Sequence, residues 1–275
     1  MKICRTVEEF RRARPELGKL ALVPTMGAFH EGHLSLMKKG KEVADSVAIS
    51  IFVNPLQFAP TDDLANYPRQ EEEDFAMAES VGVDAIFAPE TASFTQGIKT
   101  TVSVGGVSRL WEGEHRPGHF DGVATIVSKL FLVTQPDIAI FGQKDFQQCA
   151  VIAQMVEDLN FPIQLQFEPT MREESGLAMS SRNEYFTPDQ KAKACHLHDT
   201  LMSASTQIKE SDQSISDILL SSQRSLTDHN FAPEYFAYVD PVTLEPKEHR
   251  ISNGRLIVAA RFHGVRLIDN IGVFL

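Results

Sequence analysis

Short, almost uninterrupted apolar runs alternate with segments of helical periodicity through the first two-thirds of the chain. The apolar runs cover residues 19–24, 46–53, 84–89 and 137–142. Strands that are apolar along their whole length are covered on both faces, as in parallel sheets. The segments between them, 33–44, 71–82, 122–133 and 146–159, repeat apolar residues at helical spacing. This alternation predicts an α/β fold with a doubly wound parallel sheet.

The pattern changes after Thr170. A polar segment, 171–186, is followed by two amphipathic helical stretches, Pro188–Ser211 and Ser214–Asp228, and by strand-like runs at 234–240, 255–262 and 265–273. Helices followed by strands predict a smaller α+β domain. We therefore expect a Rossmann-like domain over residues 1–170 and a C-terminal α+β domain over residues 171–275.

Composition narrows the classes of function. The 275 residues include 37 acidic and 26 basic side chains, for a formal charge of −11. Without an excess of basic groups, binding to nucleic acid or to an anionic membrane surface is not expected. No apolar stretch approaches 18 residues, so neither a membrane span nor a secretory leader is predicted. Three scattered cysteines without a CxxC spacing are typical of a reducing compartment, and we expect a cytoplasmic location.

The segment GAFHEGH places His30 and His33 in a loop that follows the first predicted strand and begins a helix. Ligands bind at the carboxyl edge of such sheets, and the unpaired N–H groups of a starting helix favour anions. Gly27 and Gly32 permit close approach of a ligand to the backbone. Zinc needs a third and usually a fourth ligand, so phosphate is favoured over metal. A purely structural role for both histidines is the remaining alternative.

Two further polar segments suit phosphate chemistry. Lys144 can pair with a phosphate and Asp145 can accept from a ribose hydroxyl, although an exposed ion pair at a helix start is the simpler interpretation. Residues 179–182, Met-Ser-Ser-Arg, can donate hydrogen bonds to a triphosphate from a loop that closes over it. A helix cap or an ordinary turn is the alternative for that segment.

Several motifs together carry a family resemblance. PTMGAFHEGH (24–33) and MSSRN (179–183) resemble the two signatures of the HxGH nucleotidyltransferase superfamily. The full set resembles the pantothenate synthetase family in order and across nearly the whole chain; its other members are FVNPLQF (52–58), YPR (67–69), RPGHFDGV (116–123), FGQKDFQQ (141–148), GLAMSSRNEY (176–185) and RLIDN (266–270).

The resemblance implies a ligase reaction. ATP, as a substrate, would activate (R)-pantoate as an enzyme-bound pantoyl adenylate, and β-alanine would convert it to pantothenate, releasing AMP and diphosphate. Mg²⁺ is implied as the partner of the triphosphate, held by phosphate and water, so no protein metal ligands are expected. The resemblance also implies a homodimer.

The resemblance also assigns residues. His33, His30 and Lys144 are implied to be catalytic, with His33 donating to the phosphate, and Gln57 and Gln148 are implied to bind substrate. The implied ATP site comprises Met26, Gly27, Ala28, Phe29, His30, Glu31, Gly32, His33, Gly142, Gln143, Lys144, Asp145, Met171, Met179, Ser180, Ser181 and Arg182. Gln143 replaces the family's usual glutamate, and Met171 replaces a small aliphatic residue.

Other interpretations stay open from the sequence. The acidic run 71–74 either complements a helix dipole or places Asp74, with Glu73, near magnesium-bound phosphates or the β-alanine amine. A related nucleotidyl transferase would leave the nucleotide in its product. A nucleotide-binding regulatory module would lack turnover, and it would not need the whole set of reactive residues.

Overall fold

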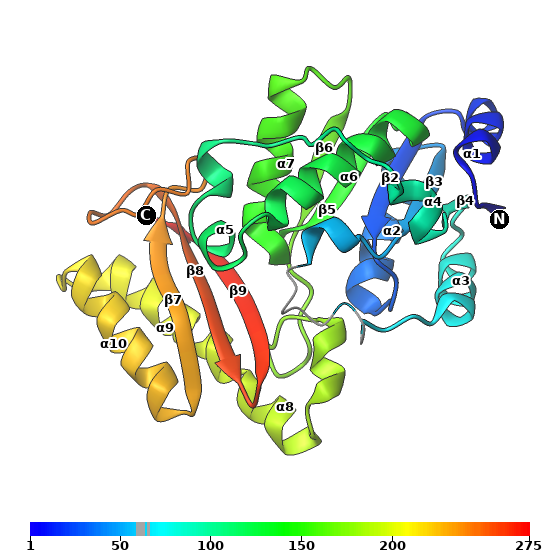
Figure 1. Cartoon of the computed structure of the whole chain (residues 1–275). Helices are drawn as coiled ribbons and strands as arrows, with labels where there is room; N and C mark the ends of the chain where they lie inside the picture. Colours follow the sequence, from blue (N-terminus) through cyan, green and yellow to red (C-terminus); the bar gives the residue numbers. More distant parts are fainter. Residues whose placement is uncertain (59–63, 65–66) are drawn as a thin grey trace. The chain divides into compact units, whose positions relative to one another are not determined.

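The computed structural model describes residues 1–58, 64 and 67–275. The chain divides into two compact units, one made of residues 1–143 and 148–169 and the other of residues 144–147 and 170–275. Figure 1 labels the main helices and strands of both units. Among the described residues, no helix combines the length and the apolar character that crossing a bilayer requires.

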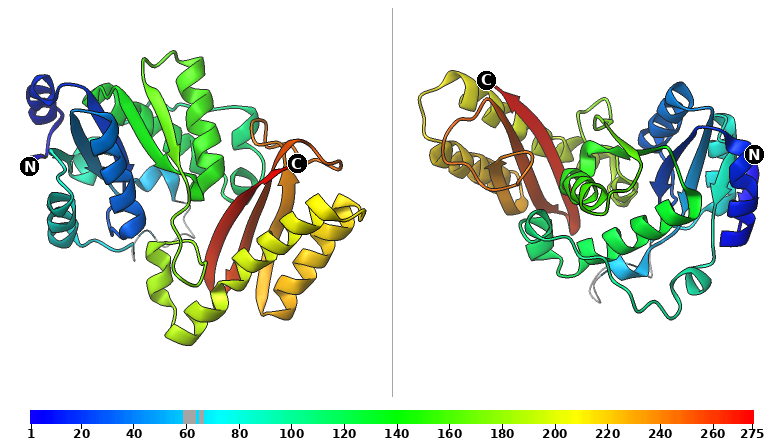
Figure 2. Two further views of the ribbon diagram at one scale, coloured as in Figure 1. Left: turned by 180° about the vertical axis from the view of Figure 1, so that it is seen from behind. Right: turned by 90° about the horizontal axis from the view of Figure 1, so that it is seen from above.

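The first unit is built on a six-stranded sheet in which every pair of neighbouring strands is parallel, in the order β1-β4-β3-β2-β5-β6 (Figures 1 and 2). Its strands are β1 (Lys2–Cys4), β2 (Leu20–Thr25), β3 (Ser46–Ile51), β4 (Ala85–Phe87), β5 (Ile138–Gly142) and β6 (Gln164–Glu168). Its helices are α1 (Val7–Ala13), α2 (Glu31–Val43), α3 (Glu71–Ser80), α4 (Thr91–Thr95), α5 (Glu112–His115), α6 (His119–Thr134) and α7 (Phe146–Asp158). The predicted α/β class with a doubly wound parallel sheet is confirmed.

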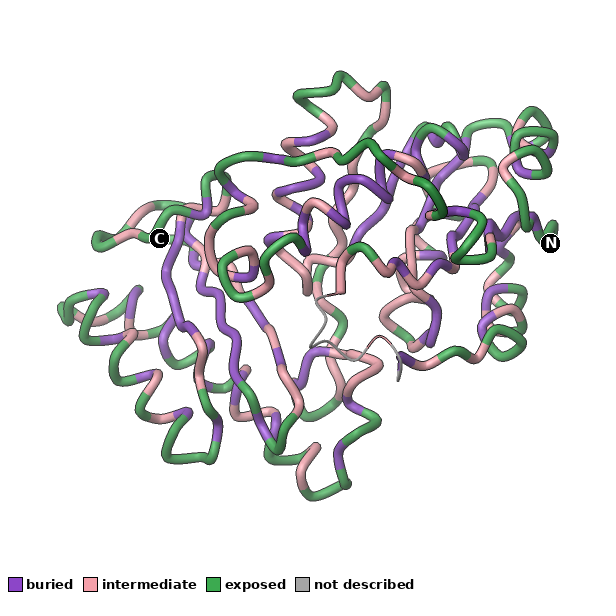
Figure 3. Tube along the Cα trace, in the orientation of Figure 1, coloured by how far each residue is buried: buried purple, intermediate pink, exposed green. Residues whose placement is uncertain are grey.

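Both faces of this sheet are covered, which explains why its central strands are apolar throughout. On one face, α2 and α3 share a core with β2, β3 and β5. On the other face, Phe10 of α1 contacts Phe87 of β4, and α6 packs on β2. Figure 3 shows buried segments along both the central strands and helix α6 of this unit.

The two edge strands, β1 and β6, were not predicted. β1 has three residues, of which only Cys4 is buried, and no residue of β6 is fully buried. Edge strands are half exposed, so their sequences carry polar residues and lack the continuous apolar run that marks a central strand. As a consequence, the loop with His30 and His33 follows the second strand of the chain, β2, rather than the first.

The pairing of β2 with β5 stops early. β2 pairs with β3 as far as Thr25↔Ile51 but with β5 only at Ala21 and Leu22. The backbone N–H and C=O groups of Thr25 both point toward β3. Because the backbone groups of successive strand residues point to opposite neighbouring strands, those of Pro24 point toward β5. Proline has no N–H, so Pro24 cannot donate a hydrogen bond to β5. The strand order also reverses between β2 and β5, which makes their carboxyl ends the topological switch point where α/β sheets bind ligands.

The second unit has a three-stranded antiparallel sheet, β7-β8-β9, and α9 and α10 share its hydrophobic core (Figure 1). Its elements are α8 (Pro188–Ala194), α9 (His196–Glu210), α10 (Ile215–Asp228), β7 (Phe231–Val239), β8 (Asn253–Phe262) and β9 (Val265–Phe274). The smaller α+β fold expected near the C-terminus is therefore present.

The single helical stretch predicted over Pro188–Ser211 is two helices, α8 and α9, separated at Cys195. Cys195 keeps helical dihedral angles, but its N–H bonds to Lys193 O instead of continuing the regular pattern of bonds to the fourth preceding residue. Apolar periodicity continues across such a local irregularity, so the sequence pattern could not reveal it.

Leu22→Ala should lower the free energy of unfolding by about 2–5 kcal/mol, because it empties space in the fully buried centre of β2. Leu132→Ala is the matched control, since the Leu132 side chain on α6 is 59% exposed, and it should change stability by at most about 0.5 kcal/mol. Urea unfolding followed by circular dichroism measures both. Equal losses in the two variants would contradict this account of the core.

Candidate active site

The loop after β2 is held by a buried carboxylate. Gly27 and Ala28 both have positive φ, +84° and +54°. The amides of Ala28 and Phe29 then donate to Asp74 Oδ2 and Oδ1 of α3, at 2.9 and 2.8 Å. A β-carbon on Gly27 would lie 2.8 Å from Asp74 Oδ2. This close approach is therefore possible only for glycine at position 27.

Asp74 has a role that sequence reasoning missed. Its side chain is 1% exposed, whereas Glu71, Glu72 and Glu73 of the same acidic run are exposed. Burial raises the pKa of Asp74, and the neighbouring Glu73 and Glu71 act in the same direction, which outweighs the two hydrogen bonds from the loop amides. Both carboxylate oxygens are engaged by the loop, so the backbone nest of Ala28 and Phe29 already contains an anion supplied by the protein.

The two histidines cap helix α2. His30 is the N-cap residue, and its Nδ1 accepts from the Gly32 amide at 3.1 Å, while His33 Nδ1 accepts from the His30 amide at 3.3 Å. This is a reciprocal capping box made by two imidazoles. Their ring centroids are 4.1 Å apart, and both side chains are half-buried.

This capping fixes the chemical character of both rings. A neutral imidazole whose Nδ1 accepts a hydrogen bond carries its proton on Nε2, which makes Nε2 the donor. Both donors belong to the first turn of α2, where the helix dipole favours negative charge. The structural interpretation of the pair is thus observed, because each Nδ1 accepts a backbone hydrogen bond at the N-terminus of α2.

Gln57 is oriented by its neighbours in a 3₁₀ turn over Pro55–Gln57. Asn54, 2% exposed, donates through Nδ2 to Gln57 Oε1 at 2.9 Å and to Gly122 O at 3.0 Å. Gln57 Nε2 in turn lies 3.3 Å from Met26 Sδ, in the loop that leads to the histidines. Asn54 was missed by sequence reasoning, although it lies within the FVNPLQF motif.

The start of α6 supports the same turn. His119 Nδ1 lies 2.8 Å from Gln57 O. A β-carbon on Gly122 would fall 2.3 Å from Leu56 O. The RPGHFDGV motif therefore contributes the helix end against which the Gln57 turn packs.

Residues 142–145 follow β5 along the chain; Gly142 and Gln143 belong to the first unit, and Lys144 and Asp145 to the second. Gln143 Nε2 donates to Phe167 O of β6 at 3.1 Å. A glutamate could not donate this bond when ionised, so the departure from the family pattern joins the ends of two strands. The Nζ atom of Lys144 lies 3.8 Å from Asp145 Oδ2. Gln148 is half-buried in the first turn of α7.

Residues 171–185, in the second unit, form a hairpin followed by a short 3₁₀ helix. Met179 N bonds to Met171 O and Glu173 N bonds to Leu177 O. Ser180 caps the 3₁₀ helix Ser181–Tyr185 by accepting from the Arg182 amide, so the capping alternative is observed for this serine. Ser181 and Arg182 are half-buried, and Met171 is exposed.

A doubly wound parallel sheet with a helix start at its topological switch point defines a ligand-binding α/β protein. The family model described as pantoate-beta-alanine ligase matches residues 2–272. The chain therefore belongs to the pantoate–beta-alanine ligase family, as its motifs predicted. It is a ligase of pantothenate biosynthesis.

Individual relatives agree over the full length. Pantothenate synthetase from Thermus thermophilus is 44% identical over 277 residues, covering 100% of both chains, and the one from Rhizorhabdus wittichii is 44% identical over 279 residues, covering 99% of both. The crystal structure of the Thermus thermophilus enzyme matches with a TM-score of 0.95 at 43% identity and full coverage of both chains. A pantoate-beta-alanine ligase from Francisella tularensis, complexed with β,γ ATP and β-alanine, matches with a TM-score of 0.79 at 32% identity, covering 98% of this chain and 97% of that one.

Asp74→Asn should change how stability depends on pH. The raised pKa means that the folded wild type binds a proton more readily than the unfolded chain does. Between pH 3.8, the ordinary pKa of the group, and the raised pKa, the contribution of Asp74 to the free energy of unfolding therefore falls as pH rises. We expect the difference in unfolding free energy between the wild type and Asp74→Asn to decrease across that interval and then to level off.

Denaturant unfolding at a series of pH values measures this difference. The matched control is Glu72→Gln, the same kind of substitution at an exposed position in the same acidic run. A difference for Asp74→Asn that stays constant or increases with pH would contradict the assignment.

Proposed function

We propose that this chain condenses (R)-pantoate with β-alanine at the expense of ATP, through a pantoyl adenylate. The observation that carries the proposal is the pair of imidazoles, His30 and His33, that cap the start of α2 through Nδ1 at the carboxyl edge of the parallel sheet. Membership in the pantoate–beta-alanine ligase family supports the substrates. The relative solved with β,γ ATP and β-alanine supports ATP and β-alanine as ligands.

In the first step, a carboxylate oxygen of pantoate bonds to the α-phosphorus of ATP, and the bond from that phosphorus to the bridging oxygen breaks to release diphosphate. Negative charge spreads over the phosphoryl oxygens in the transition state, so positioned donors are the main requirement. His33 and His30 donate through Nε2, and the Lys144 ammonium neutralises phosphate charge.

In the second step, the β-alanine amine bonds to the activated carboxyl carbon and loses a proton. The bond from that carbon to the phosphate oxygen breaks, and AMP leaves with this oxygen. Gln57 and Gln148 bind pantoate in this proposal. The Gln57 amide is preoriented by Asn54, which reduces the entropy that binding would otherwise cost.

The nucleotide is assigned to the same residues as in the sequence prediction. The loops 26–33, 142–145 and 179–182 bind ATP, with Met171 beside the adenine. One refinement comes from Asp74. Because it takes up the amides of Ala28 and Phe29, the ring donors of the histidines, rather than those two amides, contact phosphate.

Mg²⁺ enters this proposal with the triphosphate. Nowhere in the described ranges do three His, Cys, Asp or Glu side chains gather as metal ligands. Asp74 also has both oxygens bonded to backbone amides. Oxygens of the triphosphate and water therefore hold the ion in this proposal, and they suit its octahedral preference. When bound, it neutralises part of the phosphate charge.

The proposal also covers the cellular location and the oligomeric state. The three cysteines are free thiols, which suits a cytoplasmic location. A homodimer is proposed from the family resemblance. The division of labour between residues 1–170, binding ATP and pantoate, and residues 171–275, carrying a loop that closes over ATP, stays a prediction.

The decisive test uses (R)-pantoate labelled with ¹⁸O in both carboxylate oxygens, together with ATP, Mg²⁺ and β-alanine. The two steps predict one labelled oxygen in AMP and one in the amide carbonyl of pantothenate, both read by mass spectrometry. Label in inorganic phosphate would indicate an acyl phosphate instead. Nucleotide retained in the product would indicate a nucleotidyl transferase, and no turnover would favour a binding module.

Two substitutions separate capping from donation at His33. An asparagine places its oxygen near the position of Nδ1, so His33→Asn keeps the acceptor for the His30 amide but removes the Nε2 donor. A glutamine places its amide nitrogen near Nε2, so His33→Gln keeps a donor but loses the cap.

We expect His33→Asn to slow pantoate-dependent ATP–diphosphate exchange by about 100-fold or more, and His33→Gln to retain more of this activity. Melting temperatures should show the opposite order, with His33→Asn closer to the wild type. High activity in the asparagine variant would assign His33 a capping role alone.

A further inference from the structure

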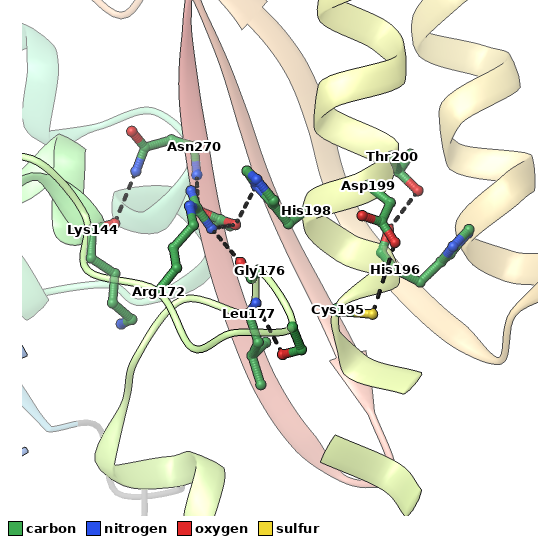
Figure 4. A network of polar contacts seen from close by, with 12 residues as sticks. Lys144, Arg172, Gly176, Leu177, Cys195, His196, His198, Asp199, Thr200 and Asn270 are labelled. Atoms are coloured by element: carbon green, nitrogen blue, oxygen red, sulfur yellow. Dashed lines mark hydrogen bonds and ion pairs between the residues drawn. The ribbon is translucent and has the colours of Figure 1, made fainter. Parts of the chain in front are cut away.

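Neighbouring residues of β9 project to opposite faces of the C-terminal sheet and contact different loops. Asp269 faces α9, where His198 lies. Asn270 faces the other side, where the backbone of Lys144 lies (Figure 4). Successive side chains of a strand alternate in this way. Both residues belong to the RLIDN motif, to which sequence analysis assigned no role.

Asn270 anchors the segment that carries Lys144. Its Nδ2 donates to Lys144 O at 3.0 Å, across 126 residues of sequence. Its Oδ1 accepts from the Arg255 guanidinium, which lies 3.8 Å from the centroid of the Phe146 ring. Asn270 is 5% exposed. One buried amide and one stacked guanidinium therefore fix the backbone of residues 144–147 on the sheet.

Asp269 anchors the hairpin of residues 171–179. Its two oxygens accept from the Arg172 guanidinium at 2.7 and 2.9 Å, and the same guanidinium donates to Gly176 O at 3.0 Å across the turn. His198 Nδ1 lies 3.6 Å from Asp269 Oδ2. Gly176, with φ +90°, comes close enough to His198 that a β-carbon there would lie 3.1 Å from the ring.

The hairpin leads directly into residues 179–182. Asn183, at the end of this segment, donates through Nδ2 to Glu173 Oε1 and to Ala178 O, which ties the segment back onto the hairpin. Asn270 and Asp269 also contact each other, because the backbone N–H of Asn270 donates to Asp269 Oδ1 at 2.7 Å.

We infer that Asn270 and Asp269 are positioning residues for the reaction: Asn270 sets the place of Lys144, and Asp269, through Arg172, sets the place of the 179–182 segment. The inference rests on the proposed function for its catalytic consequence. The anchoring itself stands on the contacts of β9. A purely structural role would instead make both residues matter for stability and leave the chemical step unchanged.

Asn270→Asp tests the first anchor, because it keeps the size and the contact with Arg255 but replaces the donor to Lys144 O with an acceptor. Asn253→Asp is the matched control, the same substitution at the exposed start of β8. We expect Asn270→Asp to lower kcat for pantoate-dependent ATP–diphosphate exchange by up to about 100-fold, the effect of a misplacement of about 1 Å, and to leave the KM for pantoate near the wild-type value.

Hydrogen exchange of backbone amides tests both anchors independently of activity. Asn270→Asp should speed exchange in a peptide covering 143–147, and Asp269→Asn should speed exchange in a peptide covering 171–183. Asn253→Asp should alter neither. Asn270→Ser, which is neutral and too short to reach Lys144 O, gives the same comparison if the new carboxylate prevents folding.

The outcomes separate the two levels of inference. Unchanged exchange in both peptides would overturn the anchoring, whatever the activity. Faster exchange with an unchanged kcat, in a preparation whose wild type makes pantothenate, would overturn the positioning role while the proposed function stands. A wild type without pantothenate-forming activity would defeat the proposed function, and with it the catalytic part of this inference, while the exchange data would still decide the anchoring.

Discussion

The buried Asp74 carboxylate determines the conformation of the loop on which the site in the first unit depends. Its hydrogen bonds to the amides of Ala28 and Phe29 hold two consecutive residues at positive φ. That conformation brings the chain to His30 in an extended state, from which α2 begins. The cost is a carboxylate in a poorly solvated position, expressed as a raised pKa. Strain and burial of this kind are commonly concentrated where a site is preorganised.

In the proposed function, the side chains of His30 and His33 serve both folding and chemistry. Serine or aspartate would cap α2 equally well, but neither would place a second donor beyond the cap. An imidazole accepts at Nδ1 and donates at Nε2, so it can complete the helix end and still contact a ligand. The half-buried environment strengthens such donors, since the local dielectric is lower than that of water.

The second unit also holds a loop with a buried carboxylate, Asp269, but the charge of the groups that contact this carboxylate differs. Asp269 is buried, like Asp74, and burial by itself would raise its pKa, but the contacts with His198 and Arg172 prevail and hold the pKa below its ordinary value. Asp74 receives neutral amides, whereas Asp269 receives a guanidinium in a bidentate pair. Each carboxylate fixes one loop that contains a family motif. In the proposed function, residues of these loops contact the ligand, whereas Asp74 and Asp269 only hold the loops in place.

The sequence by itself determined the central strands, the main helices of both units and the family, because apolar periodicity and motif residues are local signals. It could not give β1 and β6, whose half-exposed edges lack an apolar run, or the interruption at Cys195. Only the tertiary structure revealed the roles of Asp74, Asn54 and Asn270. Each of them bonds to a partner far away along the chain, at a separation of 46, 68 and 126 residues respectively, although Asn54 also bonds to Gln57 three residues away. Pairings at such separations are made by the folded sheet, and no local pattern in the sequence records them.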